Sequence, residues 1–224
     1  LVGSEMCIRD SRICPQRAVL RFFIVFDLDD TLFPEADFVI AALSELERNF
    51  NIPPGTLTST GDFPAAFNLA AKLTGRPVGE MIDFYRNCRP AIELPESTAQ
   101  TLAELRDMGC GIGLLTEGRP TTQNNKIDAL GLRRYLTREP LIASPRSAGG
   151  TGKQFASYTE GIDADLFVSV GDNPAKDFAE PRSLGWLTVM LRDKGRNIHP
   201  QPASADVNIV IDSLAELPDV LKNV

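Results

Sequence analysis

The fold of this chain is decided by the run Arg21-Phe22-Phe23-Ile24-Val25-Phe26, which ends at Asp27. A continuous apolar, β-rich run of this kind is typical of a strand buried on both faces of a parallel sheet. Similar runs recur further along the chain, at 111–116, 141–144, 166–170, 186–191 and 208–211. Helix-like patterns lie between most of them, so the sequence predicts an α/β fold with a doubly wound, mostly parallel sheet.

The helices that connect these strands have recognisable ends. We expect helices at 97–108, 120–130 and 174–184. Ser97 can cap the first, while Pro120 and Pro174 suit the first turn of the other two.

One interval breaks the alternation of strand and helix. Between residues 34 and 95 there is no convincing strand, and three amphipathic stretches occur instead, at Asp37–Asn49, Phe63–Leu73 and Val78–Asn87. The sequence therefore predicts a helical cap at 34–95, inserted into a catalytic core made of 20–33 and 96–224. Open α/β sheets bind ligands at the carboxyl ends of their strands, where this insertion would lie.

Composition narrows the range of partners. The 224 residues carry 23 Lys+Arg and 30 Asp+Glu, a net charge of −7, without a basic run, so no nucleic-acid partner is expected. No apolar stretch approaches the ~20 residues that cross a bilayer, and we expect a cytoplasmic protein with no membrane contact. The four cysteines and the single histidine, His199, show no zinc-ligand spacing.

The first eleven residues, 1–11, match no structural pattern and look like a sequencing adapter translated in frame. The alternative is a disordered native leader. We expect no function from this segment in either case.

Two carboxylates follow the first strand in Phe26-Asp27-Leu28-Asp29-Asp30-Thr31-Leu32-Phe33. Asp27 can attack a phosphorus atom, and Asp29 can pass a proton to the leaving oxygen. A lone Asp-x-Asp pair is more often an acidic loop, but the full string after a buried strand is much more specific for this phosphoryl-transfer chemistry.

A second acidic motif, Val170-Gly171-Asp172-Asn173-Pro174-Ala175-Lys176-Asp177, also follows an apolar run. Asp172 can offer Mg²⁺ a hard oxygen ligand, and Asp177 can bind through water or orient the other ligands. A carboxylate that attacks a phosphate dianion needs such a cation. The alternative is a plain turn between a strand and a helix.

Two further segments carry polar candidates. The segment Leu115-Thr116-Glu117-Gly118-Arg119-Pro120 can hold phosphoryl oxygens through the Thr116 hydroxyl and backbone N–H groups at a helix start, with Arg119 as a possible contact. Lys153 lies on the Gly-rich segment 149–152 and can neutralise the phosphoryl charge. Taken alone, either segment has an ordinary structural explanation.

In this order, the four motifs resemble the haloacid dehalogenase-like (HAD) hydrolase superfamily over residues 22–191. The resemblance implies a Rossmannoid core and a Mg²⁺-dependent phosphatase acting on a small phosphorylated metabolite. It makes Asp27 the nucleophile that becomes an aspartyl-phosphate and Asp29 the general acid and base. Thr116 and Lys153 would hold the phosphoryl group. Mg²⁺ would be bound by Asp27, Asp29 (through its carbonyl) and Asp172, with support from Asp177.

The chain departs from the family pattern in two places. Gln154 follows Lys153, where the family usually has proline, and Glu117 replaces a residue that is more often Asn, Asp or Ser. The second aspartate, Asp29, separates the chain from the dehalogenases, whose leaving halide needs no proton. Two alternatives remain open: a phosphomutase, and a non-catalytic protein that keeps the scaffold.

Overall fold

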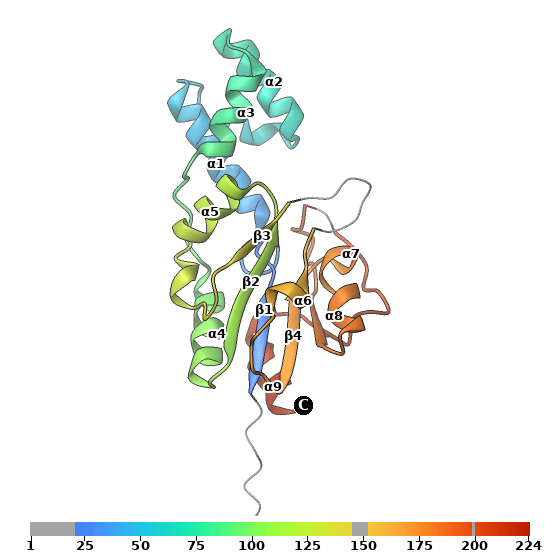
Figure 1. The fold of residues 1–224 in the computed structure, drawn as a ribbon. Coiled ribbons are helices and arrows are strands. Elements are labelled where there is room, and N and C mark those ends of the chain that lie inside the picture. The colour runs from blue at the N-terminus through green and yellow to red at the C-terminus, as the bar shows by residue number, and fades with distance from the viewer. Residues whose placement is uncertain (1–20, 145–151, 199) are drawn as a thin grey trace, which may run out of the picture.

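The chain is built on one six-stranded parallel sheet, seen in a computed structural model that describes residues 21–144, 152–198 and 200–224 (Figure 1). The strand order is β3-β2-β1-β4-β5-β6, and every neighbouring pair is parallel. The strands are β1 (Phe22–Phe26), β2 (Gly111–Glu117), β3 (Leu141–Ala143), β4 (Leu166–Gly171), β5 (Leu187–Leu191) and β6 (Ile209–Ile211). The predicted α/β fold is confirmed, and each predicted strand is found with one end shifted by a single residue.

The sheet is buried on both faces, which explains the uninterrupted apolar runs. Ile24 and Phe26 of β1 pack into the main hydrophobic cluster together with the helices α4 (Glu96–Asp107), α5 (Pro120–Ala129) and α9 (Leu217–Lys222). Phe23 and Val25 point to the opposite face, where α6 (Phe155–Tyr158) and Trp186 cover them. Alternate residues of a strand point to opposite faces, so both halves of the β1 pattern are satisfied.

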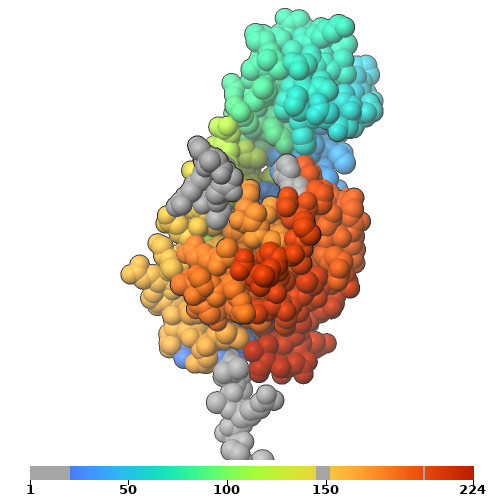
Figure 2. Space-filling model, turned by 90° about the vertical axis from the view of Figure 1, so that its right-hand side faces the viewer, coloured from blue at the N-terminus to red at the C-terminus, as the bar shows by residue number. Residues whose placement is uncertain are grey.

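The interval between β1 and α4 is helical, as predicted. It contains α1 (Glu35–Asn49), a 3₁₀ turn η1 (Thr58–Thr60), α2 (Phe63–Thr74) and α3 (Val78–Asn87). These elements form the helical insertion, a lobe that projects beyond the carboxyl ends of the strands (Figures 1 and 2).

The helical insertion has an apolar cluster of its own. The buried members are Val39, Leu43, Leu46, Ile52, Leu57, Ala66, Ala70 and Met81. The first turns of α1 belong elsewhere, because Phe38 and Ala42 pack in the main cluster under the sheet. Phe38 is therefore not in the core of the helical insertion.

The prediction of one continuous helix at 174–184 is wrong, because the structure has two short helices there, α7 (Pro174–Asp177) and α8 (Ala179–Ser183). A continuous helix would need the residue at 181 to donate its N–H to the carbonyl of Asp177. Pro181 has no N–H. The Asp177 carbonyl instead accepts a hydrogen bond of 2.8 Å from the Ser169 hydroxyl of β4.

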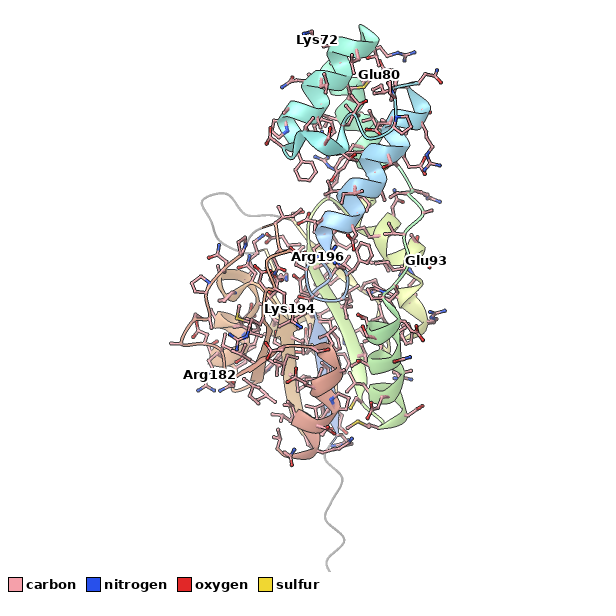
Figure 3. All side chains as sticks on the ribbon, turned by 180° about the vertical axis from the view of Figure 1, so that it is seen from behind. Lys72, Glu80, Glu93, Arg182, Lys194 and Arg196 are labelled. Carbon is pink, nitrogen blue, oxygen red and sulfur yellow. The ribbon has the colours of Figure 1, made fainter. Side chains whose placement is uncertain are left out.

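The loop after β5 returns to the helical insertion. Arg196 lies 2.6 Å from Asp37 of α1, and Ile198 packs against the apolar cluster of the helical insertion. The Ile198 N–H donates to Asp30 Oδ2 at 3.1 Å. Figure 3 shows Arg196 at the level where α1 leaves the core. Among the described helices, none has both the length and the apolar character needed to cross a membrane.

Candidate active site

A tight turn after β1 places the first two carboxylates. The Asp27 N–H donates to the Val170 carbonyl at 2.9 Å, which extends the pairing of β1 with β4 to the start of the motif. Asp30 has a left-handed backbone with φ of 57°, and its Oδ1 accepts the Glu35 N–H at 2.9 Å, which joins the turn to the start of α1. Asp27 and Asp29 then both line a cavity of about 170 Å³.

The cavity gathers residues from all four predicted segments. Its lining consists of Asp27, Asp29, Asp30, Glu35, Thr116, Glu117, Lys153, Asp172, Asn173 and Lys176. Asp177 is buried beside it, with 1% of the residue exposed. The carboxyl ends of β1, β2 and β4 thus meet as the strand order requires.

Two of the predicted substrate-binding residues do not line the cavity. The Gly118 N–H donates to the Ala143 carbonyl of β3 at 3.0 Å, so it is already engaged. Arg119 is exposed at the start of α5.

Lys153 lies at the centre of the charge arrangement. Its Nζ is 2.8 Å from Asp27 Oδ1 and 2.5 Å from Asp177 Oδ1, and 3% of the residue is exposed. Burial opposes the charge on this ammonium, but Asp177 and Asp27 outweigh it and hold the pKa of Lys153 above its ordinary value. The Gly-rich residues 149–151 before it lie outside the described residues.

The second acidic motif is held by hydrogen bonds. Asp172 accepts from the Thr31 hydroxyl at 3.2 Å and from Asn197 Nδ2 at 2.9 Å. Asp177 Oδ2 accepts the Asn173 N–H at 2.9 Å while its Oδ1 faces Lys153. Both Asp177 oxygens therefore have protein partners, which suits a residue that orients its neighbours.

The carboxylate cluster fits a divalent cation. Asp27, Asp172 and Asp177 each offer an oxygen within 4.8 Å of the others. Burial, together with the neighbouring carboxylates, raises the pKa of Asp172 to about 8. Burial also raises the pKa of Asp27 to about 6, although Lys153 opposes the shift. Buried carboxylates that repel one another are stabilised by a hard cation such as Mg²⁺, whose preferred ligands are oxygens.

Glu117 has a clear structural role. Its Oε1 lies 2.8 Å from Lys176 Nζ, and its Oε2 accepts the Gly152 N–H at 2.6 Å. It therefore links the end of β2 to α7 and to the segment that carries Lys153. The side chain of Lys176 is 41% exposed and reaches the cavity rim.

Four residues near the site were not predicted. Lys126 and Gln123 of α5 contact Asp29, Asn197 contacts Asp172, and Glu35 of α1 lines the cavity. Burial and the nearby Asp29 raise the pKa of Glu35 to about 7. The only signal in the sequence is the polar character of 120–126, which lacks the apolar stripe of an ordinary core helix.

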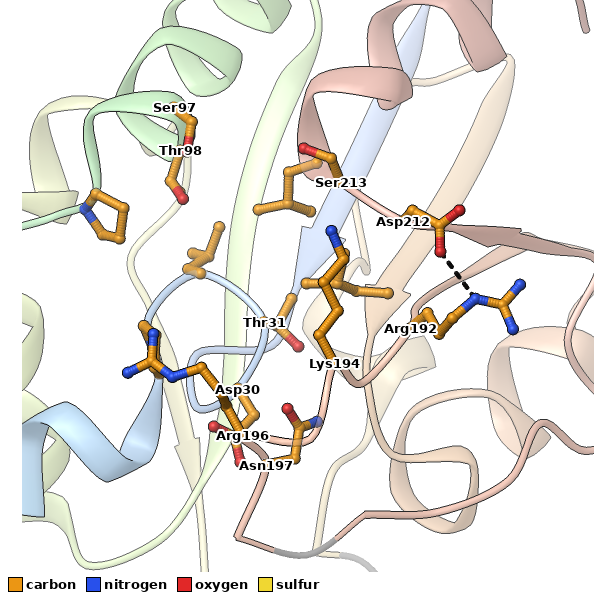
Figure 4. Close-up of a pocket in the computed structure, with 15 residues that line it drawn as sticks. Asp30, Thr31, Ser97, Thr98, Arg192, Lys194, Arg196, Asn197, Asp212 and Ser213 are labelled. Carbon is orange, nitrogen blue, oxygen red and sulfur yellow. Dashed lines mark hydrogen bonds and ion pairs between the residues drawn. The ribbon is translucent and has the colours of Figure 1, made fainter.

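A larger cavity of about 300 Å³ lies on the other side of the turn after β1 (Figure 4). Asp30, Thr31 and Asn197 line it, together with Ser97 and Thr98 at the start of α4. Arg192 and Asp212 pair across its edge at 2.8 Å. Neither Asp27 nor Lys153 reaches it, so the reacting groups belong to the smaller cavity.

No family model matches the chain. The sequence is 29% identical over 231 residues to the glyceraldehyde 3-phosphate phosphatase of Methanocaldococcus jannaschii, covering 89% of this chain and 96% of the relative. The enzyme of the same name from Methanopyrus kandleri is 25% identical over 224 residues, with coverage of 89% and 96%. Among solved structures, the HAD-hydrolase YfnB from Bacillus subtilis, bound to magnesium, matches with a TM-score of 0.62 at 17% identity, covering 90% of this chain and 99% of YfnB.

The parallel sheet, the helical insertion after β1 and the carboxylates at the strand ends make up a Rossmannoid α/β fold with a candidate active site. The fold is the one found in solved haloacid dehalogenase-like (HAD) hydrolases, which the four sequence motifs also resemble.

Proposed function

We propose that the chain is a Mg²⁺-dependent phosphatase that hydrolyses a small phosphomonoester through an aspartyl-phosphate at Asp27. The observation that carries this proposal is the buried Lys153 ammonium held between Asp27 and Asp177, beside Asp172. A cation at this position neutralises the nucleophile and the incoming phosphoryl group together. The relatives named glyceraldehyde 3-phosphate phosphatase support a phosphorylated metabolite of that size as substrate.

In the first step, a carboxylate oxygen of Asp27 attacks phosphorus as the ester P–O bond breaks. Asp29, two residues further along the turn and in the same cavity, gives its proton to the departing alcohol oxygen. The Thr116 hydroxyl, which also lines the cavity, holds a phosphoryl oxygen. Bound Mg²⁺, held by Asp27, Asp172 and the Asp29 carbonyl, would supply positive charge to the phosphoryl oxygens.

In the second step, Asp29 removes a proton from water, which attacks the phosphorus of the aspartyl-phosphate. The Asp27–phosphorus bond breaks, inorganic phosphate leaves, and Asp27 is restored as a carboxylate. Lys153 stays paired with Asp27 and keeps the restored charge balanced.

We also propose that residues 34–95 act as a cap over the site. The first helix, α1, brings Glu35 into the cavity lining, so movement of the helical insertion would change the lining itself. The cytoplasmic location and the absence of nucleic-acid or membrane partners stay predictions from the sequence.

The test is the variant Asp27→Asn, assayed with glyceraldehyde 3-phosphate and with 4-nitrophenyl phosphate in Mg²⁺. We expect no turnover of either substrate and an unchanged circular dichroism spectrum, because Asn lacks the nucleophilic charge but keeps the shape. Residual activity equal to that of the unmodified protein would disprove the aspartyl-phosphate route.

A further inference from the structure

Helix α5 holds both oxygens of the Asp29 carboxylate. Lys126 Nζ lies 2.6 Å from Oδ1, and Gln123 Nε2 donates to Oδ2 at 2.9 Å. The two donors are three residues apart, so one face of the helix presents them together. The carboxylate can therefore rotate only by breaking one of these contacts.

Burying the Lys126 ammonium costs free energy. Only 2% of the residue is exposed, and a buried ammonium loses its hydration. Besides Asp29, the compensation comes from the ring of Phe38, whose centroid is 4.5 Å from Nζ. Phe38 lies on α1, so the cation is enclosed between the core and the first helix of the insertion.

Gln123 joins Asp29 to a second motif. Its Nε2 also donates to the Thr116 hydroxyl at 2.8 Å, and 2% of the residue is exposed. The side-chain amide of Gln123 therefore fixes the distance between Asp29, which is expected to donate the proton, and Thr116, which is expected to hold the phosphoryl group.

The neighbouring residues of α5 hold the end of α3 and the residue that follows it. The Thr122 hydroxyl donates to the Arg86 carbonyl at 3.0 Å, and Asn125 Nδ2 donates to the Cys88 carbonyl at 3.0 Å. One short helix thus contacts Asp29 on one side and the exit of the helical insertion on the other.

We infer that Lys126 and Gln123 are positioning residues for Asp29, and that they fit the chain to phosphomonoesters of aliphatic alcohols. This inference rests on the proposed function. An alkoxide is a poor leaving group, so the Asp29 proton must reach the ester oxygen as its bond to phosphorus breaks, at hydrogen-bond distance. An aryl oxide with an electron-withdrawing ring leaves without that proton.

The experiment compares Lys126→Met and Gln123→Met on two substrates, glyceraldehyde 3-phosphate and 4-nitrophenyl phosphate. For the alkyl phosphate, we expect kcat to fall about 100-fold, the lower end of the usual range for general acid–base catalysis. For the aryl phosphate, the loss should stay below about tenfold, with KM nearly unchanged for both. Gln123→Met alone decides the matter if Lys126→Met fails to fold.

The matched control is Lys72→Met on α2, which removes an exposed lysine far from the cavity (Figure 3). It should leave both rates unchanged. Equal losses on the two substrates, no loss on either, or an unmodified protein that turns over only the aryl phosphate would each overturn the inference. An active Asp27→Asn variant would instead overturn the proposed function, so the two failures are distinguishable.

Discussion

At the scale of single residues, Lys153 balances the negative charges of two largely buried carboxylates. It lies between Asp27 and Asp177 with almost no exposure. Removing one partner of a buried ion pair leaves uncompensated charge and typically costs 3–5 kcal/mol. For Lys153→Met in EDTA, we expect the free energy of unfolding to fall by about 3 kcal/mol in urea denaturation, with loss of phosphatase activity.

The control for that variant is Lys222→Met, whose lysine side chain is 53% exposed and pairs with the exposed Asp219. Its free energy of unfolding should change by less than about 1 kcal/mol, as for other exposed pairs. Equal stability of Lys153→Met and the unmodified protein would contradict the charge-balance explanation.

A second prediction at this scale concerns pH. The pKa of Asp172 in the metal-free fold is about 8, raised by burial and by the nearby Asp27, Asp177 and Asp30 from its ordinary 3.8. The folded chain therefore binds more protons than the unfolded chain between these pH values, and stability falls as pH rises from about 4 to about 8. In EDTA, the melting temperature should decline across this range.

Added Mg²⁺ should remove most of that decline, because the cation stabilises the ionised carboxylates. Parallel thermal melts in EDTA and in Mg²⁺ measure the effect. If the melting temperature in EDTA stays constant up to pH 8, ionisation of Asp172 does not destabilise the fold.

At the scale of elements, the exit from β4 depends on one glycine. A Cβ placed on Gly171 would lie 2.3 Å from Asp177 Oδ2, too close for any side chain. Gly171→Ala should push Asp177 away from Lys153 and from the Asn173 N–H. Changes in groups that orient metal ligands typically cost 10–100-fold in affinity or activity, so we expect the Mg²⁺ concentration for half-maximal activity to rise about tenfold.

Gly79→Ala in α3 is the matched control, because nothing lies within 4 Å of the added methyl group. Its Mg²⁺ dependence should equal that of the unmodified protein. If the two alanine variants behave alike, the close approach of Asp177 to the strand end is unimportant.

The elements also show what the sequence could predict and what it could not. The strands were predicted because each is buried on both faces, so its apolar run is continuous whatever lies beside it. Asp27 and Asp172 could be predicted as candidates because they directly follow such strands. Lys126 was missed because a buried lysine and a solvated one look identical in a sequence, and its partner Asp29 is 97 positions away.

The break between α7 and α8 was missed for a related reason. Pro181 alone permits a helix in which it occupies an early position, and α8 does begin at Ala179. The Asp177 carbonyl accepts its hydrogen bond from the Ser169 hydroxyl, which belongs to a neighbouring strand. Contacts of this kind depend on tertiary structure.

At the scale of the whole molecule, the apolar cluster of the helical insertion is separate from the clusters on the two faces of the sheet, which predicts separate responses to mutation. Leu57 is fully buried in the cluster of the helical insertion, whereas Trp186, the single tryptophan, packs between Phe155 and Phe167 on the sheet. Leu57→Ala should destabilise the helical insertion by 2–5 kcal/mol. Its far-UV circular dichroism midpoint in urea should fall while the tryptophan fluorescence midpoint stays in place.

Leu105→Ala is the control, because Leu105 lies in the main cluster beneath the sheet. That variant should shift both midpoints together. Coincident shifts for Leu57→Ala as well would show that the helical insertion and the core unfold as one cooperative unit.

The loop after β5 affects how chimeras of this protein must be designed. Arg196 and Ile198 touch the helical insertion although they lie more than a hundred positions beyond its end. The contacts that support the helical insertion therefore extend beyond residues 34–95. A chimera that grafts a different lobe onto this core must transplant residues 193–198 along with it, or the graft will meet a foreign arginine and an unmatched isoleucine at its base.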